Sequence, residues 1–236
     1  MAEGRQVRVL AGSVELEGIL AVPERARGVV LFAHGSGSGR FSPRNQQVAG
    51  AFQSRGLATL LIDLLTPEEA ELDEQTRRLR FHIPLLAERV VDATGWLEHA
   101  METQTLRVGL FGSSTGAAAA LVAAHRRPER IAAVVSRGGR VDLAGDSLGA
   151  VRAPVLLVVG GADEVVLDLN REALDQLSNE HSRMAIVPGA GHLFEEPGAL
   201  EMVSRLAADW FERWLDPTAG RAASHGEAAP PNLVWD

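Results

Sequence analysis

The chain begins with alternating apolar and polar residues and then changes to short apolar runs. Residues 5–11 and 13–23 alternate, with Leu16 and Leu20 on one side and Glu15 on the other, a period typical of half-buried antiparallel strands. The later runs are GVVLFA at 28–33, ATLLID at 58–63, VGLF at 108–111, IAAVV at 131–135 and PVLLVV at 154–159. Continuous apolar runs of this length predict parallel strands that are covered on both faces.

Helix-like stretches separate these runs. Residues 83–101 and 197–215 carry apolar side chains near a period of 3.6, among them Val90 and Trp210. Strand and helix patterns alternate from about residue 28, which predicts an α/β fold with a mostly parallel central sheet and helices on both faces. Ligands of such sheets bind at the carboxyl ends of the strands.

Two segments stand outside this alternation. Residues 64–82 are charged and irregular, which indicates either a solvated helix or loop or a flap over the site. The stretch from Pro217 is rich in Ala, Pro and Gly, which predicts little regular structure. We therefore expect one domain over residues 1–216 and an irregular tail over residues 217–236.

Composition narrows the classes of function. The 236 residues are 46% hydrophobic and have a formal net charge of -8, so we expect one domain, a small-molecule ligand, and neither nucleic acid nor an anionic membrane as partner. The 23 basic residues are all arginine, which excludes a Schiff-base lysine and a phosphate-loop lysine.

The sequence also predicts no cofactor and no metal site. Cysteine is absent, which excludes disulfides, thiolate zinc sites and a cysteine nucleophile. Histidines and carboxylates do not fall at ligand spacing on one helix. The amino-terminal residues lack the pattern of a signal peptide, and no apolar run approaches the roughly 18 residues that span a bilayer. We therefore expect a cytoplasmic protein of unassigned oligomeric state.

The stretch GLFGSSTGAAAAL at 109–121 holds the first candidate for chemistry. Gly112, Ser114 and Gly116 form GxSxG between an apolar run and an alanine-rich helix pattern, which is the setting of a nucleophile elbow. The turn exposes the central side chain above the sheet, so Ser114 is the candidate nucleophile. The hydroxyl of Ser113 is expected to point elsewhere.

A serine nucleophile needs a base and an orienting carboxylate, in the chain order serine, acid, histidine. Asp163 follows the run PVLLVVGG and His192 follows MAIVPGAG. Both therefore lie at carboxyl ends of predicted strands, the same edge as Ser114. Asp142, Glu164 and Asp168 are weaker candidates for the acid. The remaining histidines considered for the base, His99, His125 and His181, lie on helices or at a helix end without glycine context.

The same edge supplies candidates for oxyanion and substrate binding. The backbone amide of Thr115 lies at a helix start, and the amide of Ser36 lies in the loop AHGSGSGR that follows a strand. We predict that these two amides bind the oxyanion and that His34 braces their loop. Arg40 and Arg137, with Arg44 and Arg140, are candidates for binding an acidic group of the substrate or for bracing loops.

The GSGSG loop has a rival interpretation as a dinucleotide fingerprint, with Asp63 as the ribose-binding acid. The spacing does not fit, because GxGxxG requires glycine where Arg40 or Ser42 stands. Ser42 and Pro43 also start a helix well after the glycines, so the loop is too long for the pyrophosphate of a dinucleotide to bind directly at the start of that helix. Nucleotide binding is therefore not predicted.

Several stretches together resemble the α/β-hydrolase superfamily and its dienelactone-hydrolase-like branch over about residues 5–215. They are AHGSGSGRFSPRN, LLIDLLTPEE, RRLRF, GLFGSSTGAAAAL, VVSRGGRVDLAG, VVGGADEVV and PGAGHLFEEPGAL. The resemblance implies an eight-stranded sheet, a triad of Ser114, Asp163 and His192, and hydrolysis of small carboxylic esters or lactones. Dienelactone hydrolases proper carry a cysteine where this chain has Ser114, so the resemblance implies a serine carboxylesterase.

Two classes of function follow from these residues. The first is a serine hydrolase that acts on a small ester or lactone through an acyl-enzyme. The second is a binding protein that keeps the fold without turnover. The complete set of Ser114, Asp163 and His192 favours the enzyme, because a binding domain has no need for all three groups together.

Overall fold

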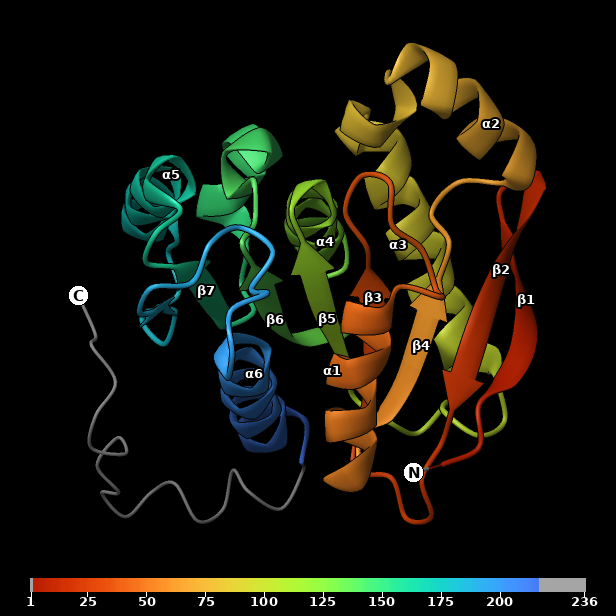
Figure 1. Ribbon diagram of the computed structural model, residues 1–236. Coiled ribbons are helices and arrows are strands. Elements are labelled where there is room, and N and C mark those ends of the chain that lie inside the picture. Colours follow the sequence, from red (N-terminus) through yellow and green to blue (C-terminus); the bar gives the residue numbers. More distant parts are fainter. Residues whose placement is uncertain (1, 217–236) are drawn as a thin grey trace.

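A computed structural model describes residues 2–216 of the chain (Figure 1). The tail expected over residues 217–236 lies outside the described residues. The predicted α/β fold is confirmed: helices cover both faces of a mostly parallel sheet (Figure 1).

The sheet in the described part of the chain has eight strands. They are β1 (Arg5–Ala11), β2 (Val14–Ala21), β3 (Val29–Ala33), β4 (Ala58–Ile62), β5 (Val108–Ser113), β6 (Ile131–Arg137), β7 (Val155–Gly160) and β8 (Arg183–Val187). Their order is β1-β2-β4-β3-β5-β6-β7-β8. β1 pairs with β2 and β2 with β4 in antiparallel fashion, and the pairs from β4 through β8 are parallel. The alternating residues at the start therefore form the antiparallel side of the sheet, as expected.

The helices occupy the connections between strands. They are α1 (Pro43–Ser54), α2 (Pro67–Thr76), α3 (Ile83–His99), α4 (Thr115–Arg126), α5 (Glu164–Gln176) and α6 (Ala199–Leu215), with 3-10 segments η1 (Leu79–Phe81) and η2 (Val141–Ala150). α1 and α6 cover one face of the sheet, while α3, α4 and α5 cover the other (Figure 1). In the described residues no helix combines the length and apolarity needed to cross a membrane.

The core lies in two layers, one on each face of the sheet. On the α4 side, the four residues Ala117–Ala120 are completely buried, and their small side chains let the helix pack closely onto the sheet. On the α1 side, the rings of Phe32, Phe52 and Phe111 lie 4.9 to 5.7 Å apart. The strands between these layers are buried on both sides, which explains their continuous apolar runs.

Helix starts follow the local sequence. The Ser42 hydroxyl accepts a hydrogen bond from the Asn45 backbone N–H, and Pro43 occupies the first turn of α1, where its missing N–H removes no helical bond. The loop after β3 crosses the carboxyl edge of the sheet, and the cap at Ser42 fixes the end of this loop where α1 begins.

The charged segment over residues 64–82 is more ordered than its composition indicates. It contains α2 and η1, and Figure 1 shows α2 at the carboxyl edge of the sheet, beyond the end of β4. Thr66 caps α2 through reciprocal hydrogen bonds with Glu69, a capping box that a sequence can signal. The segment therefore has a defined shape beside the edge where ligands of such sheets bind.

Candidate active site

Ser114 lies at the sharp turn from β5 to α4. Its backbone has φ 50° and ψ -124°, an uncommon conformation for a residue with a side chain. A Cβ on Gly116 would lie 2.1 Å from the Ala33 carbonyl oxygen, and one on Gly112 would lie 2.5 Å from Ala117 Cα. Only glycine lets α4 approach β3 and β5 this closely, so the packing holds Ser114 in its strained turn.

The two adjacent serines have different surroundings. The Ser113 hydroxyl is buried and accepts a hydrogen bond of 3.2 Å from the Gly35 backbone N–H. Ser114 is half-buried. Ser113 therefore fastens the loop after β3 to the end of β5, and Ser114 remains the hydroxyl that a ligand can reach.

Asp163 and His192 are in direct contact. Asp163 lies just after β7, at the start of α5, and His192 lies in the loop between β8 and α6. The distance from His192 Nδ1 to Asp163 Oδ2 is 2.7 Å, with the imidazole side chain 40% exposed and the carboxylate 15% exposed. A protonated Nδ1 donates to the carboxylate, which orients the ring and leaves Nε2 free as a base.

The turn after β6 lies against both Ser114 and His192. The Ser114 backbone N–H donates to the Arg137 carbonyl at 3.3 Å, and a Cβ on the next residue, Gly138, would lie 3.6 Å from His192 Nδ1. No hydrogen bond joins the Ser114 hydroxyl to His192 in the described residues. Such contacts are often long in the absence of substrate.

The alternative acids do not contact His192. Asp142 forms a two-point ion pair with Arg140, at 2.9 and 2.7 Å. Asp168 lies on α5 and pairs with Arg171, and Glu164 is exposed in the first turn of that helix. Among the candidates, the structure brings Asp163 alone to the imidazole.

The other histidines are explained by local contacts. His99 Nδ1 lies 2.7 Å from the Gly95 carbonyl on α3, and the His181 ring packs against Trp214 at 5.2 Å. His125 is exposed at the end of α4. None of them lies in the loops that carry Ser114, Asp163 and His192.

The predicted oxyanion donors lie side by side. The hydroxyls of Ser36 and Thr115 are 3.2 Å apart, which brings the loop after β3 next to the first residue of α4. Neither backbone amide donates a hydrogen bond to another atom of residues 2–216. An unpaired amide at a helix start, with a second one in the neighbouring loop, forms a suitable place for developing negative charge.

His34 holds this loop in place. Its Nε2 accepts a hydrogen bond from the Leu64 backbone N–H and its Nδ1 donates to the Gly35 carbonyl, both at 2.9 Å. Burial lowers the pKa of His34, although the Gly35 carbonyl and the Asp63 charge oppose this effect. The neutral ring therefore links the loops after β3 and β4, which agrees with the bracing role expected from the sequence.

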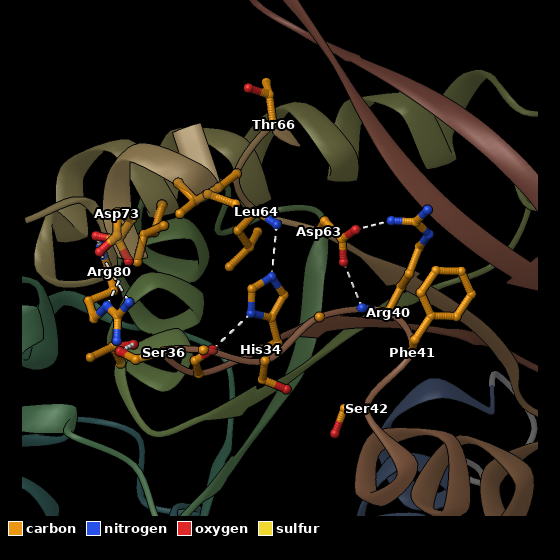
Figure 2. A pocket seen from close by; sticks show the side chains of 18 of the residues that line it. His34, Ser36, Arg40, Phe41, Ser42, Asp63, Leu64, Thr66, Asp73 and Arg80 are labelled. Carbon is orange, nitrogen blue, oxygen red and sulfur yellow. Dashed lines mark hydrogen bonds and ion pairs between the residues drawn. The ribbon is translucent and has the colours of Figure 1, made fainter. Parts of the chain in front are cut away.

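A cavity of about 420 Å³ opens beside Ser36 and Thr115 (Figure 2). Ser36 and Thr115 lie in its wall, together with residues of the loop after β3 and of the segment that contains α2. Its wall combines apolar side chains such as Leu64 and Phe41 with charged ones such as Asp73 and Arg80. The cavity has the size of a small-ligand site.

The two arginines expected to bind substrate differ sharply. Arg40 lines the cavity, but its guanidinium pairs with both Asp63 and Glu17 and lies 4.3 Å from the Phe41 ring centre. Its backbone N–H also donates to Asp63. These contacts give Arg40 a bracing role. Arg137 has no such carboxylate partner within the described residues.

Two contributors to the site were not predicted. Asp73 accepts hydrogen bonds from the Leu79 backbone N–H and from Arg80, which fixes the wall of the cavity. Asp63 holds the loop after β3 through Arg40. No local pattern signals these pairs, because each depends on how the chain returns across the sheet edge. Among residues 2–216 no three metal-binding side chains lie close enough to hold one ion.

Comparisons with known proteins agree with this fold. The model of the dienelactone hydrolase family matches residues 16–217. A solved dienelactone hydrolase from Anabaena variabilis is 57% identical and superposes with a TM-score of 0.89, over 91% of this chain and 99% of that chain. Est1E from Butyrivibrio proteoclasticus has a TM-score of 0.72 over 89% of this chain and 98% of that chain, at 15% identity, which shows likeness of fold alone.

A curated relative carries a different name. A Mycobacterium tuberculosis protein provisionally named a phosphoribosyl transferase is 57% identical over 206 residues, which are 87% of this chain and 45% of that protein. The chain thus spans about half the length of the curated relatives it matches most strongly. Less than half of that relative is aligned, so its name describes a longer protein.

Proposed function

The chain belongs to the dienelactone hydrolase family, and from this premise we propose that it is a serine hydrolase that cleaves small carboxylic esters or lactones through an acyl-enzyme. The observation that carries the proposal is the 2.7 Å contact between His192 Nδ1 and Asp163 Oδ2, at the same sheet edge as the strained, accessible Ser114.

The proposed first step is attack by Ser114 on the ester carbonyl. His192 Nε2 takes the proton from the Ser114 hydroxyl as its oxygen bonds to the carbonyl carbon. Asp163 holds the imidazole in the tautomer that has a free Nε2 and stabilises the cation that forms. His192 then donates the proton to the leaving alcohol, and the acyl group remains on Ser114.

The carbonyl oxygen becomes negative during attack. The amides of Ser36 and Thr115 donate to no other atom of residues 2–216, and the hydroxyls of these two residues are 3.2 Å apart, which supports their assignment as the oxyanion donors. Loss of one such donor in serine hydrolases costs about 10²–10³ in kcat. A water molecule activated by His192 then hydrolyses the acyl-enzyme and returns Ser114 to its starting state.

The transferase name of the curated relatives is a weaker basis for a proposal. More than half of the aligned M. tuberculosis protein lies outside the matched part, so the name of that whole protein is no evidence for the activity of this region. Ester hydrolysis gives a role to the amide of Thr115 at the start of α4 and to that of Ser36 in the loop after β3. We therefore assign the esterase chemistry to the region that carries Ser114.

The test is hydrolysis of p-nitrophenyl acetate and butyrate by the wild type and by Ser114→Ala. We expect kcat to fall by about 10³–10⁶ in the variant, because the nucleophile is lost. Ser113→Ala is expected to stay within about tenfold of the wild type, since that hydroxyl binds the Gly35 amide. Equal rates in wild type and Ser114→Ala would overturn the proposal and favour a binding protein on the same fold.

A further inference from the structure

The turn over residues 137–140, directly after β6, contacts the backbone of Ser114 from both sides. The Ser114 N–H donates to the Arg137 carbonyl at 3.3 Å, and the Arg140 N–H donates to the Ser114 carbonyl at 3.0 Å. The φ of 50° at Ser114 is uncommon for a residue with a side chain, so its conformation depends on surrounding contacts of this kind. The position of the proposed nucleophile therefore depends on this turn.

The same turn lies against the loop that carries His192. A Cβ on Gly138 would lie 3.2 Å from the His192 carbonyl oxygen and 3.2 Å from a ring carbon of Phe194. The Gly138 N–H donates to the Val158 carbonyl on β7 at 2.8 Å. Because groups packed this closely leave no free space between them, a displacement of the turn would move Ser114 relative to the imidazole.

A buried amide on α5 holds the turn. Asn170 Nδ2 donates to the Gly139 carbonyl at 2.9 Å and to the Val166 carbonyl, one helical turn earlier, at 2.7 Å, and Asn170 is completely buried. Both acceptors are carbonyls, which fixes the orientation of the side-chain amide. α5 begins directly after Asp163, so Asn170 connects the helix next to the acid with the turn that holds the nucleophile.

The stability of the fold alone does not explain an asparagine at this place. Asn170 Oδ1 is buried and has no hydrogen-bond partner in residues 2–216, and an unpaired buried acceptor costs about 1–3 kcal/mol. Leucine has a similar volume, a higher helix propensity and no polar group to desolvate. What Asn170 provides and an apolar residue lacks is the hydrogen bond to the Gly139 carbonyl.

We propose that Asn170 is a positioning residue of the hydrolase: it fixes the turn over residues 137–140 through the Gly139 carbonyl and so aligns the Ser114 hydroxyl with His192 Nε2. The inference rests on the proposed function and deepens it. Misplacement of reacting groups by about 1 Å can cost about 10²-fold in rate. Because Asn170 acts through the backbone of the turn, its loss should slow the reaction of Ser114 and leave substrate binding nearly unchanged.

The test is the rate constant for labelling of Ser114 by a fluorophosphonate, which measures the reactivity of each folded molecule rather than the folded fraction. In Asn170→Leu we expect this constant, and kcat for p-nitrophenyl acetate per labelled site, to fall about ten- to hundredfold. KM should stay within about threefold of the wild type, and Tm should be equal to or above it. Asn170→Ala removes the amide without adding bulk and should show the same loss of rate.

The matched control is Thr94→Val. Thr94 is completely buried on α3, and its hydroxyl donates to the Val90 carbonyl, one helical turn earlier, at 2.8 Å, as Asn170 does to Val166. The substitution removes a buried bond of the same kind from another helix, so the labelling constant should stay within about twofold of the wild type. A wild-type constant in both Asn170 variants would overturn the inference, and so would an equal loss in Thr94→Val.

Amide exchange separates failure of this inference from failure of the proposed function. Asn170→Leu should speed exchange in residues 137–142 about tenfold, because the turn loses the bond that holds it, whether or not the protein hydrolyses esters. Wild-type exchange in that segment would overturn the positioning role. If the wild type neither hydrolyses esters nor is labelled, the proposed function itself is overturned, and faster exchange in the variant would then assign Asn170 to the fold.

Discussion

His34 shows how one side chain can set the position of the oxyanion loop. Its ring connects the Leu64 N–H to the Gly35 carbonyl, and Gly35 in turn donates to Ser113 beside the elbow. The acceptor role of Nε2 requires a neutral ring, because a protonated imidazole has no acceptor. The site therefore depends on a histidine that takes no part in the proposed proton transfers.

The lowered pKa of His34 predicts a loss of stability in mild acid. Below pH 6.5 His34 is protonated in the unfolded chain, whereas the folded state resists this protonation. The contribution of His34 to the free energy of unfolding is therefore present in full above pH 6.5, and it is lost as the pH falls toward the lower pKa of the folded state. The contribution has a slope of at most about 1.4 kcal/mol per pH unit. Urea unfolding between pH 5 and 8 measures it.

His34→Asn is expected to reduce this slope, since it removes the titrating group. His125→Asn is the control, because His125 is exposed on α4, and its slope should match that of the wild type. A His34→Asn variant with the wild-type slope would show that another group causes the acid sensitivity.

At the scale of elements, α2 and η1 form one folded wall of the cavity. The helix ends at Thr76, and the residue that caps it, Arg77, has φ 55°. The chain then returns, so that Asp73 accepts hydrogen bonds from the Leu79 and Arg80 backbone N–H groups and from Arg80 Nε. Asp73 is the buried residue of a helix that is otherwise largely exposed. A buried carboxylate, rather than an apolar face, holds this segment in shape.

Asp73→Ala is therefore expected to loosen the segment without unfolding the protein. The loss of the charged hydrogen bonds should cost about 1–3 kcal/mol locally and speed amide exchange in residues 67–82 about tenfold or more. KM for p-nitrophenyl butyrate should rise, because the wall of the cavity moves. Hydrogen exchange with mass spectrometry and steady-state kinetics measure both effects.

The matched control for this change is Glu71→Ala, an exposed carboxylate on the same helix. Its exchange and KM should remain those of the wild type. Unaltered exchange over residues 67–82 in Asp73→Ala would contradict the assigned role of the ion pair with Arg80.

At the scale of the whole molecule, the parallel strands bring distant loops to one edge. Ser114, Asp163 and His192 follow β5, β7 and β8, and their common edge could be predicted because continuous apolar runs and small residues mark those strand ends in the sequence. The antiparallel pair at the start could be predicted from its alternation. Both expectations about the fold are confirmed.

The remaining features depend on contacts between residues far apart in the chain. Whether Arg40 binds substrate or braces a loop is decided by its distance to Asp63 and Glu17, and no spacing encodes that distance. Likewise, the charged composition of residues 64–82 does not indicate that one carboxylate, that of Asp73, is buried and holds the segment in shape. That Arg137 Nη1 is buried without a hydrogen-bond partner in residues 2–216 likewise depends on how the fold surrounds it.

The most direct test of the central claim is covalent labelling by a fluorophosphonate, with the modified residue located by peptide mass spectrometry. The account predicts one adduct on Ser114, no adduct in Ser114→Ala, and labelling slowed at least about hundredfold in His192→Ala, because the base that activates the hydroxyl is missing. No adduct on Ser114 in the wild type, or equal labelling of wild type and Ser114→Ala, would contradict it.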